Sequence, residues 1–105
     1  MRLKDKVAII TGAGSGIGEV TARLFASEGA AVMIADINQP AAESVAVSIN
    51  AEGGRAAWTA VDVTSSASAE KMVQVTLNSF GRVDVLFNNA GIEGFGSVIE
   101  ADETS

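Results

Sequence analysis

The sequence predicts an α/β fold in which helices cover both faces of a doubly wound parallel sheet, giving three layers in the order α/β/α. Two observations lead to this prediction. Short, continuous apolar runs, typical of strands buried on both faces, alternate with longer stretches whose apolar residues recur at helical spacing. Such regular alternation implies right-handed crossover connections, which make consecutive strands parallel and place helices on both sides of the sheet.

Four apolar runs are the predicted strands, and they cover Val7–Ile10, Ala31–Ala35, Ala56–Val61 and Val83–Phe87. The helix expected after the first strand ends at Gly29, and one of its faces consists of Ile17, Val20, Thr21, Leu24 and Phe25. The second helix opens near Pro40, ends before Gly53, and is expected to bury Ala42, Val45, Ala46 and Ile49. The third ends at Gly81 and repeats the helical spacing with Ala69, Met72, Val73, Thr76, Leu77 and Phe80.

Composition excludes several classes of function. With 105 residues, 48% of them hydrophobic, the chain is expected to be one domain or less over residues 1–105, with enough apolar residues for a core. A net charge of −6 argues against a nucleic-acid partner, which needs a basic face. The sequence has no Cys and no His, so it has no disulfide framework and offers only carboxylates as metal ligands. Its apolar runs are too short to cross a membrane, and a cytoplasmic location is expected.

The strongest motif follows the first predicted strand directly and reads Thr11-Gly12-Ala13-Gly14-Ser15-Gly16-Ile17-Gly18. Glycine lets the backbone turn sharply and approach a ligand closely. The helix that follows directs its free N–H groups and positive dipole end to the same place, where an anion is favoured. This arrangement predicts a site for the diphosphate of a nucleotide, whereas the alternative is an ordinary tight turn.

Asp36 ends the second predicted strand, 20 residues after Gly16. An acidic residue at about this distance from a glycine turn is expected to accept hydrogen bonds from a ribose. It would repel a 2′-phosphate, and no Lys or Arg lies in the turn or at Ile37 and Asn38 to offset that repulsion. The sequence therefore favours NAD over NADP. The alternative roles for Asp36 are an N-cap of the next helix and a solvated loop charge.

Two further motifs close the third and fourth strands: Asp62-Val63-Thr64 and Asn88-Asn89-Ala90-Gly91. Together with the glycine turn and Asp36, they make the whole chain resemble the short-chain dehydrogenase/reductase family. The resemblance implies a Rossmann-type sheet with strand order 3-2-1-4. It also implies an oxidoreductase that transfers a hydride between NAD(H) and an alcohol or ketone, and a homo-oligomer.

Carried over residue by residue, the resemblance assigns each motif one part of NAD. The residues expected to cradle the diphosphate are Gly12, Ser15, Gly16, Ile17 and Gly18. The residues expected along the adenosine are Asp36 on the ribose, Ile37 beside the adenine, Asp62 on the adenine amino group and Val63 on the ring. Those expected beneath the cofactor are Asn89, Ala90 and Gly91, with Ile92 near the nicotinamide ribose. Asn88 and Asn89 have an alternative role as scaffold, and Thr11 is expected to bond back to the Asn-Asn-Ala-Gly turn.

The catalytic residues of the family are missing from this sequence. The resemblance implies a Ser and a Tyr-x-x-x-Lys pair, in which Tyr exchanges a proton with the substrate oxygen, but the chain has no Tyr. We therefore expect the cofactor-binding half of an enzyme, inactive alone. The acidic end of the chain from Glu100 looks like the start of a further helix, as in the front part of a longer protein. A non-catalytic NAD-binding module and a self-associating fragment are the alternatives.

The fourth strand would be an edge strand in the order 3-2-1-4, although its pattern Val-Asp-Val-Leu-Phe is that of a central strand. It lacks the Lys or Pro that usually protects an edge. The isolated chain is accordingly expected to be unstable, or to pair through Val83–Phe87 with another chain.

Overall fold

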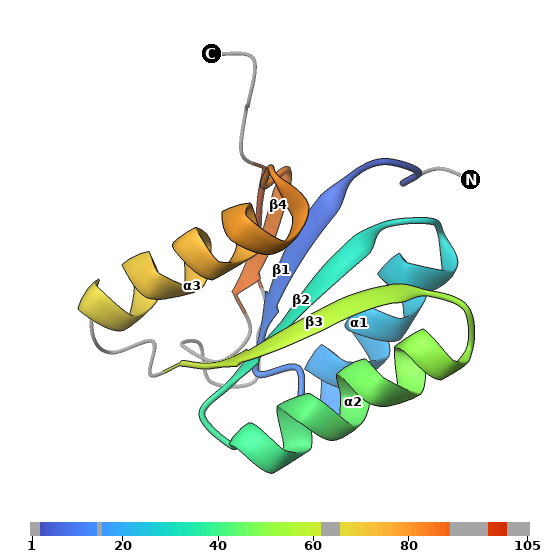
Figure 1. Cartoon of the computed structure of the whole chain (residues 1–105), viewed down its shortest axis with the longest axis horizontal. Helices are drawn as coiled ribbons and strands as arrows, with labels where there is room; N and C mark the ends of the chain where they lie inside the picture. Colours follow the sequence, from blue (N-terminus) through green and yellow to red (C-terminus); the bar gives the residue numbers. More distant parts are fainter. Residues whose placement is uncertain (1–2, 15, 62–65, 89–96, 101–105) are drawn as a thin grey trace.

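The computed structural model describes residues 3–14, 16–61, 66–88 and 97–100 (Figure 1). Strands and helices alternate through most of the chain, as the sequence predicts. In chain order the elements are β1 (Val7–Thr11), α1 (Gly16–Ser27), β2 (Ala31–Asp36), α2 (Gln39–Ala51), β3 (Arg55–Ala60), α3 (Ser66–Phe80), β4 (Val85–Asn88) and β5 (Ser97–Glu100).

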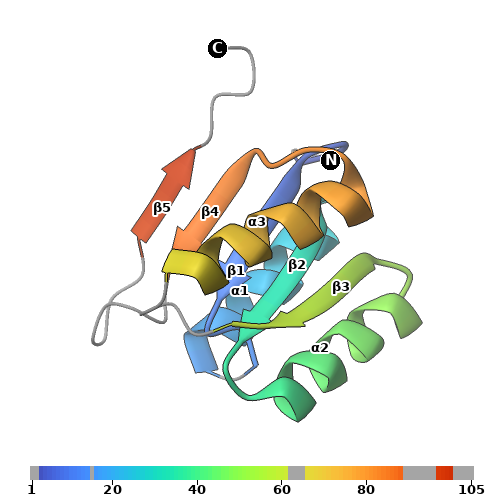
Figure 2. The same cartoon turned by 60° about the vertical axis from the view of Figure 1, so that its left-hand side comes forward.

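The sheet has the order β3-β2-β1-β4-β5. The pairs β1–β2, β2–β3 and β1–β4 are parallel, which confirms the predicted order 3-2-1-4 for these four strands. The prediction that β4 is an edge is wrong, because β5 pairs with it in antiparallel register, from Val85 opposite Glu100 to Asn88 opposite Ser97 (Figure 2). Glu100, which the sequence suggested as the start of a helix, is the last residue of β5.

Helices α1 and α2 lie on one face of the sheet and α3 on the other (Figure 1). Successive residues of a strand point to opposite faces, so each strand contributes to two cores. Ile10 and Ile34 pack with residues of α1 and α2, whereas the adjacent Ile9 and Met33 pack with Met72 of α3. The central strands β1 and β2 are buried on both sides, as their continuous apolar runs predict.

Of the large apolar residues in helix α1, only Phe25 packs against the core of the sheet. The buried residues of this helix are the small Gly18 and Ala22, whereas Ile17, Val20 and Leu24 are 62%, 66% and 56% exposed. A side chain at Gly18 would place its Cβ 2.2 Å from the Gly12 carbonyl oxygen. The helix therefore approaches the glycine turn too closely for a larger residue, and its apolar face turns outward.

The other two helices follow the predicted pattern more closely. Helix α2 buries Ala42, Val45, Ala46 and Ile49, all of them predicted. Helix α3 buries Met72 and Thr76, but Val73 and Leu77, placed on the same face by the sequence, are each 39% exposed. Residues at positions i and i+4 lie one turn apart, so the buried pair marks the center of the contact and the exposed pair its rim.

A buried carboxylate joins the beginnings of β1 and β4. Asp84 is 2% exposed, and its Oδ2 accepts a hydrogen bond of 2.7 Å from the N–H of Val7. The Asp84 N–H donates to the Val7 carbonyl at 2.8 Å, and Arg82 donates to Oδ1 at 2.6 Å. These bonds set the register of β4 beside β1.

Candidate functional site

The carboxyl ends of β1, β2 and β4 meet at one edge of the sheet, where open α/β sheets bind ligands (Figure 1). Two contacts tie these ends together. The N–H of Ala13 donates to the Ala35 carbonyl at 3.2 Å, joining the glycine turn to β2. The buried Thr11 hydroxyl donates to the Phe87 carbonyl at 3.4 Å, joining β1 to β4. Phe87 directly precedes the Asn-Asn-Ala-Gly motif, so Thr11 bonds to the residue just before the turn with which it was expected to bond.

The glycine turn leads directly from β1 into α1. Gly12 and Gly16 have φ angles of 65° and 60°, a left-handed conformation that favours glycine. Apart from its chain neighbours and its own helix, no described residue lies within 4 Å of a Cβ built at Gly16, so the described part of the chain leaves space there. The first N–H groups of α1, at Gly16, Ile17 and Gly18, have no acceptor within the helix and carry the positive end of its dipole. The turn therefore offers an open group of donors suited to an anion.

The carboxylate of Asp36 lies beside this turn. Its Oδ2 accepts a hydrogen bond of 2.8 Å from the N–H of Gly14, and its Oδ1 accepts one of 2.9 Å from the N–H of Asn38. It does not cap helix α2, because the N-cap is Asn38, whose side-chain oxygen accepts from Ala41 at 3.1 Å. Asp36 is partly exposed, so its remaining lone pairs are accessible to a ligand.

Two exposed apolar side chains belong to these segments, one in α1 and one directly after β2. Ile17 belongs to the first turn of α1, and Ile37, 74% exposed, follows β2. Neither residue packs in the core, so both are free to contact a flat apolar group. No Lys or Arg occurs in residues 11–22 or 36–42, so neither of these two segments supplies a cation to pair with Asp36.

Several predicted site residues lie outside the described part of the chain: Ser15, Asp62, Val63, Asn89, Ala90, Gly91 and Ile92. The remaining ones lie in two segments, the glycine turn with the first turn of α1 (Gly12, Gly16, Ile17 and Gly18) and the end of β2 (Asp36 and Ile37), which the hydrogen bond from Gly14 to Asp36 joins. Sequence reasoning missed two contacts, those of Gly14 and Asn38 with Asp36. An Asn directly before Gln39-Pro40 is a recognisable N-cap signal, but no spacing rule indicates the contact between Gly14 and Asp36.

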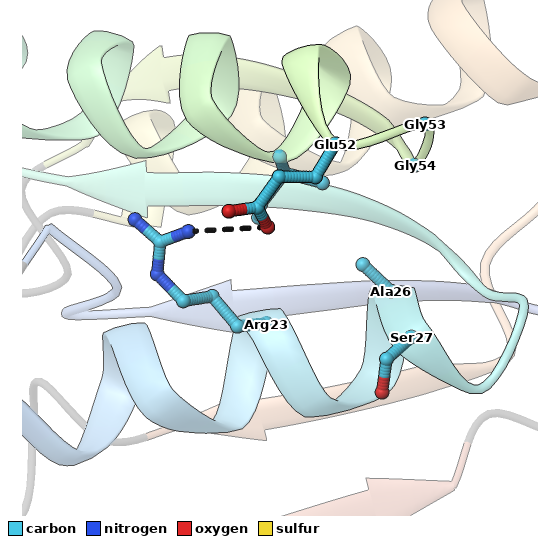
Figure 3. Close-up of a pocket in the computed structure, with 7 residues that line it drawn as sticks. Arg23, Ala26, Ser27, Glu52, Gly53 and Gly54 are labelled. Atoms are coloured by element: carbon cyan, nitrogen blue, oxygen red, sulfur yellow. Dashed lines mark ion pairs between the residues drawn. The ribbon is translucent and has the colours of Figure 1, made fainter.

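A separate hollow of about 250 Å³ lies between the C-terminal parts of α1 and α2. Arg23 and Glu52 form an ion pair of 3.8 Å across it (Figure 3). Arg23 also bonds to Glu19 at 2.9 Å and to the Ser48 hydroxyl at 3.0 Å, so its charge is already balanced within the protein. This hollow adjoins Gly53 and Gly54, which lead into the amino end of β3, away from the carboxyl ends that form the candidate site.

Other kinds of site find no support in the described residues. Within them, no three His, Cys, Asp or Glu side chains gather as a metal site would require. None of the helices in the described ranges has the length and apolar character needed to cross a membrane. In the described part of the chain, the geometry suits the binding of an anion at the glycine turn, beside a carboxylate that accepts hydrogen bonds.

Comparison with known proteins gives the same family throughout. A family model described as short chain dehydrogenase matches residues 6–105. A meso-2,3-butanediol dehydrogenase from Serratia marcescens is 46% identical over 100 residues, covering 95% of this chain and 39% of that protein. An uncharacterized oxidoreductase from Thermotoga maritima is 44% identical, covering 98% of this chain and 40% of that protein.

Solved structures agree with these relatives. A hydroxysteroid dehydrogenase from Escherichia coli superposes with a TM-score of 0.84 at 44% identity, covering 89% of this chain and 40% of that one. A 7α-hydroxysteroid dehydrogenase complexed with NADH and 7-oxo glycochenodeoxycholic acid gives a TM-score of 0.79 at 42% identity, covering 81% of this chain and 33% of that one. The chain thus spans about 40% of the length of the curated relatives it matches.

Proposed function

Because the chain belongs to the short-chain dehydrogenase family, we propose that it binds NAD and supplies the cofactor-binding half of an oxidoreductase acting on an alcohol or ketone. Members of this family use nicotinamide cofactors, and a structural relative is complexed with NADH. Related proteins named for butanediol and hydroxysteroid oxidation support an alcohol or ketone as the substrate class. The protein is proposed to act as a cytoplasmic homo-oligomer.

The described residues fit such a cofactor at two points. The first N–H groups of α1 and the open space over Gly16 suit a diphosphate. Asp36 suits the adenosine ribose, and the exposed Ile37, which follows it in the chain, suits the adenine. Ser15, Asp62, Val63, Asn89, Ala90, Gly91 and Ile92 keep their proposed roles from the family resemblance, as further contacts along the cofactor.

The observation that carries the choice of NAD is the environment of Asp36. Its carboxylate is held beside the glycine turn and has no Lys or Arg near it in sequence to accept a phosphate. A 2′-phosphate would bring negative charge against this carboxylate, whereas a free 2′-hydroxyl would donate a hydrogen bond to it.

When bound, NAD would supply the hydride acceptor for oxidation of an alcohol and, in its reduced form, the hydride donor for reduction of a ketone. The hydroxyl proton that is lost or gained in the same reaction needs a protein group, which the resemblance assigns to a Tyr. These 105 residues contain no Tyr, His or Cys, so we place that group outside this sequence and expect this chain by itself to bind cofactor without turnover.

The direct test is a titration of the chain with NAD⁺ and NADP⁺ by isothermal calorimetry. We expect Asp36→Ala to weaken NAD⁺ binding about tenfold and to narrow the preference over NADP⁺, because a hydrogen-bonded carboxylate is removed. Glu43→Ala removes an equal charge from an exposed position on α2 and serves as the control. Unchanged dissociation constants for both cofactors in Asp36→Ala would refute the assignment of the ribose.

The absence of Tyr, His and Cys also favours a second candidate, a non-catalytic NAD-binding module. The two candidates predict the same cofactor contacts and differ only in whether a proton donor accompanies this chain. The intact mass of the natural gene product separates them. A mass well above the 10.7 kDa of this chain supports the enzyme, and a mass of 10.7 kDa supports the module.

A further inference from the structure

We propose that Gly14 is a positioning residue that selects the cofactor by holding the Asp36 carboxylate ready for a vicinal diol. This inference rests on the proposed function, because it concerns the same ribose site. Gly14 was not among the residues expected to contact the cofactor. Its role comes from one contact across the fold, the 2.8 Å hydrogen bond from its N–H to Asp36 Oδ2.

The two oxygens of Asp36 are each held by one backbone donor. Gly14, in the turn after β1, donates to Oδ2, and Asn38, at the start of α2, donates to Oδ1. An ionised carboxylate has about four lone-pair positions, two on each oxygen, so one position on each oxygen is left to accept. Two adjacent hydroxyls on a ribose ring offer two donors, one for each carboxylate oxygen. The carboxylate is therefore oriented before the ligand arrives, and little ordering remains to be done on binding.

Only glycine at position 14 leaves room for this arrangement. A Cβ at this position would lie 2.8 Å from Asp36 Oδ2 and 2.8 Å from the Ala41 Cβ. Both distances are shorter than real Cβ contacts, so Asp36 or helix α2 would have to move. Gly14 does not have a left-handed φ, unlike Gly12 and Gly16. Its replacement by Ala therefore acts through the added methyl group and not through strain in the turn.

The preference for NAD⁺ over NADP⁺ should therefore depend on Gly14, because Gly14 positions the Asp36 carboxylate. If the carboxylate is displaced, its hydrogen bonds to the diol are lost, and NAD⁺ binds more weakly. The 2′-phosphorylated cofactor has no such diol to lose and is relieved of part of the repulsion. The preference for NAD⁺ over NADP⁺ should therefore shrink in Gly14→Ala, with most of the change on the NAD⁺ side.

The test is a double-mutant cycle on the full chain with Gly14→Ala, Asp36→Ala and the double variant, each titrated with NAD⁺ and NADP⁺. We expect Gly14→Ala to weaken NAD⁺ binding about tenfold, and NADP⁺ binding by less than about twofold. The double variant should show the same preference between the two cofactors as Asp36→Ala, because the preference depends on the Asp36 side chain, whereas the contact with Ala41 that remains affects both cofactors alike. Equal weakening of both cofactors by Gly14→Ala, or additive losses of preference in the double variant, would overturn the proposal and make Gly14 a part of the diphosphate turn only.

A second variant covers the case in which Gly14→Ala fails to fold. Asp36→Glu leaves the turn untouched and keeps the charge, but its extra methylene moves the carboxylate past the Gly14 N–H. We expect it to shrink the NAD⁺ preference in the same direction. A preference equal to that of the unchanged protein would contradict the need for a fixed carboxylate.

A measurement without cofactor separates this proposal from the proposed function. In the ¹H–¹⁵N spectrum of the chain, the amide proton of Gly14 should move upfield in Asp36→Ala, since it loses its acceptor, and that of Asn38 should follow. Unmoved resonances would overturn the positioning role directly. If the amides shift as expected but Asp36→Ala binds both cofactors as before, the positioning contact stands and the ribose assignment of the proposed function is what fails.

Discussion

At the scale of single residues, two carboxylates with different surroundings have different roles. Asp36 is partly exposed and keeps acceptor capacity for a ligand, whereas Asp84 is buried and uses its oxygens within the protein. Burial by itself would raise the pKa of Asp84. The hydrogen bonds from Arg82 and Val7, and the positive charges of Arg82 and Lys6, outweigh burial and hold this pKa below its ordinary value. Asp84 is therefore a structural carboxylate that stabilises the fold while ionised.

Asp84→Asn should destabilise the chain by about 1–3 kcal/mol at pH 7. The uncharged amide is a weaker acceptor for the buried N–H of Val7, and it no longer forms an ion pair with Arg82. Since the folded-state pKa is lowered, the unfolded state binds the proton more readily at low pH. The stabilisation of the fold by ionised Asp84 is therefore complete above the pKa of an unfolded Asp, about 3.9, and is lost as the pH falls through the lower pKa of Asp84 in the folded chain. Urea unfolding of both proteins should show a stability difference at pH 7 that narrows below about pH 4. A difference independent of pH would contradict this role.

At the scale of elements, helix α1 shows how close packing decides which face is buried. Gly18 and Ala22 allow the helix to approach the sheet, and Val20 and Leu24 then project outward with Ile17. Three exposed apolar residues at positions i, i+3 and i+7 form a stripe along one helix face, and we propose this face as the surface through which the chain would self-associate. In helix α2, by contrast, the face with the larger apolar residues is the one buried.

Replacing Val20 and Leu24 together by Gln should reduce self-association of the chain, because it removes most of the apolar stripe while leaving the buried face intact. Sedimentation velocity at several concentrations measures this. Val47→Gln, at an exposed apolar position of α2 outside the stripe, is the matched control and should change little. Equal self-association of the double variant and the unchanged protein would show that another surface is responsible.

At the scale of the whole molecule, β5 determines what lies at the edge of the sheet. The order β3-β2-β1-β4-β5 places β4 between two neighbours, which agrees with its apolar pattern. Without β5, the backbone groups of β4 that face it would be exposed and free to pair with a second chain. The instability expected for an uncovered β4 therefore depends on whether β5 stays in place.

Val98→Pro combined with Ile99→Pro should uncover β4 and increase association or aggregation, because proline removes backbone donors from β5. Val98→Thr with Ile99→Thr keeps every N–H and the strand preference, and is the control. Light scattering during storage at fixed concentration gives the measurement. Prolines that leave the chain as monomeric as the threonine control would show that the β4–β5 pairing does not protect the sheet.

The sequence by itself indicated three helices and four of the five strands, because apolar periodicity is a local signal. Its motifs also showed the resemblance to the family, and that resemblance implied the order 3-2-1-4 of those four strands. The sequence also marked Asp36 as a candidate and identified the buried face of α2. The tertiary structure alone decided three further features: the outward turn of α1, the pairing of β5 with β4, and the contact of Gly14 with Asp36. Each depends on how closely two segments distant in sequence approach one another, a distance set by side-chain volume and strand register in the folded chain.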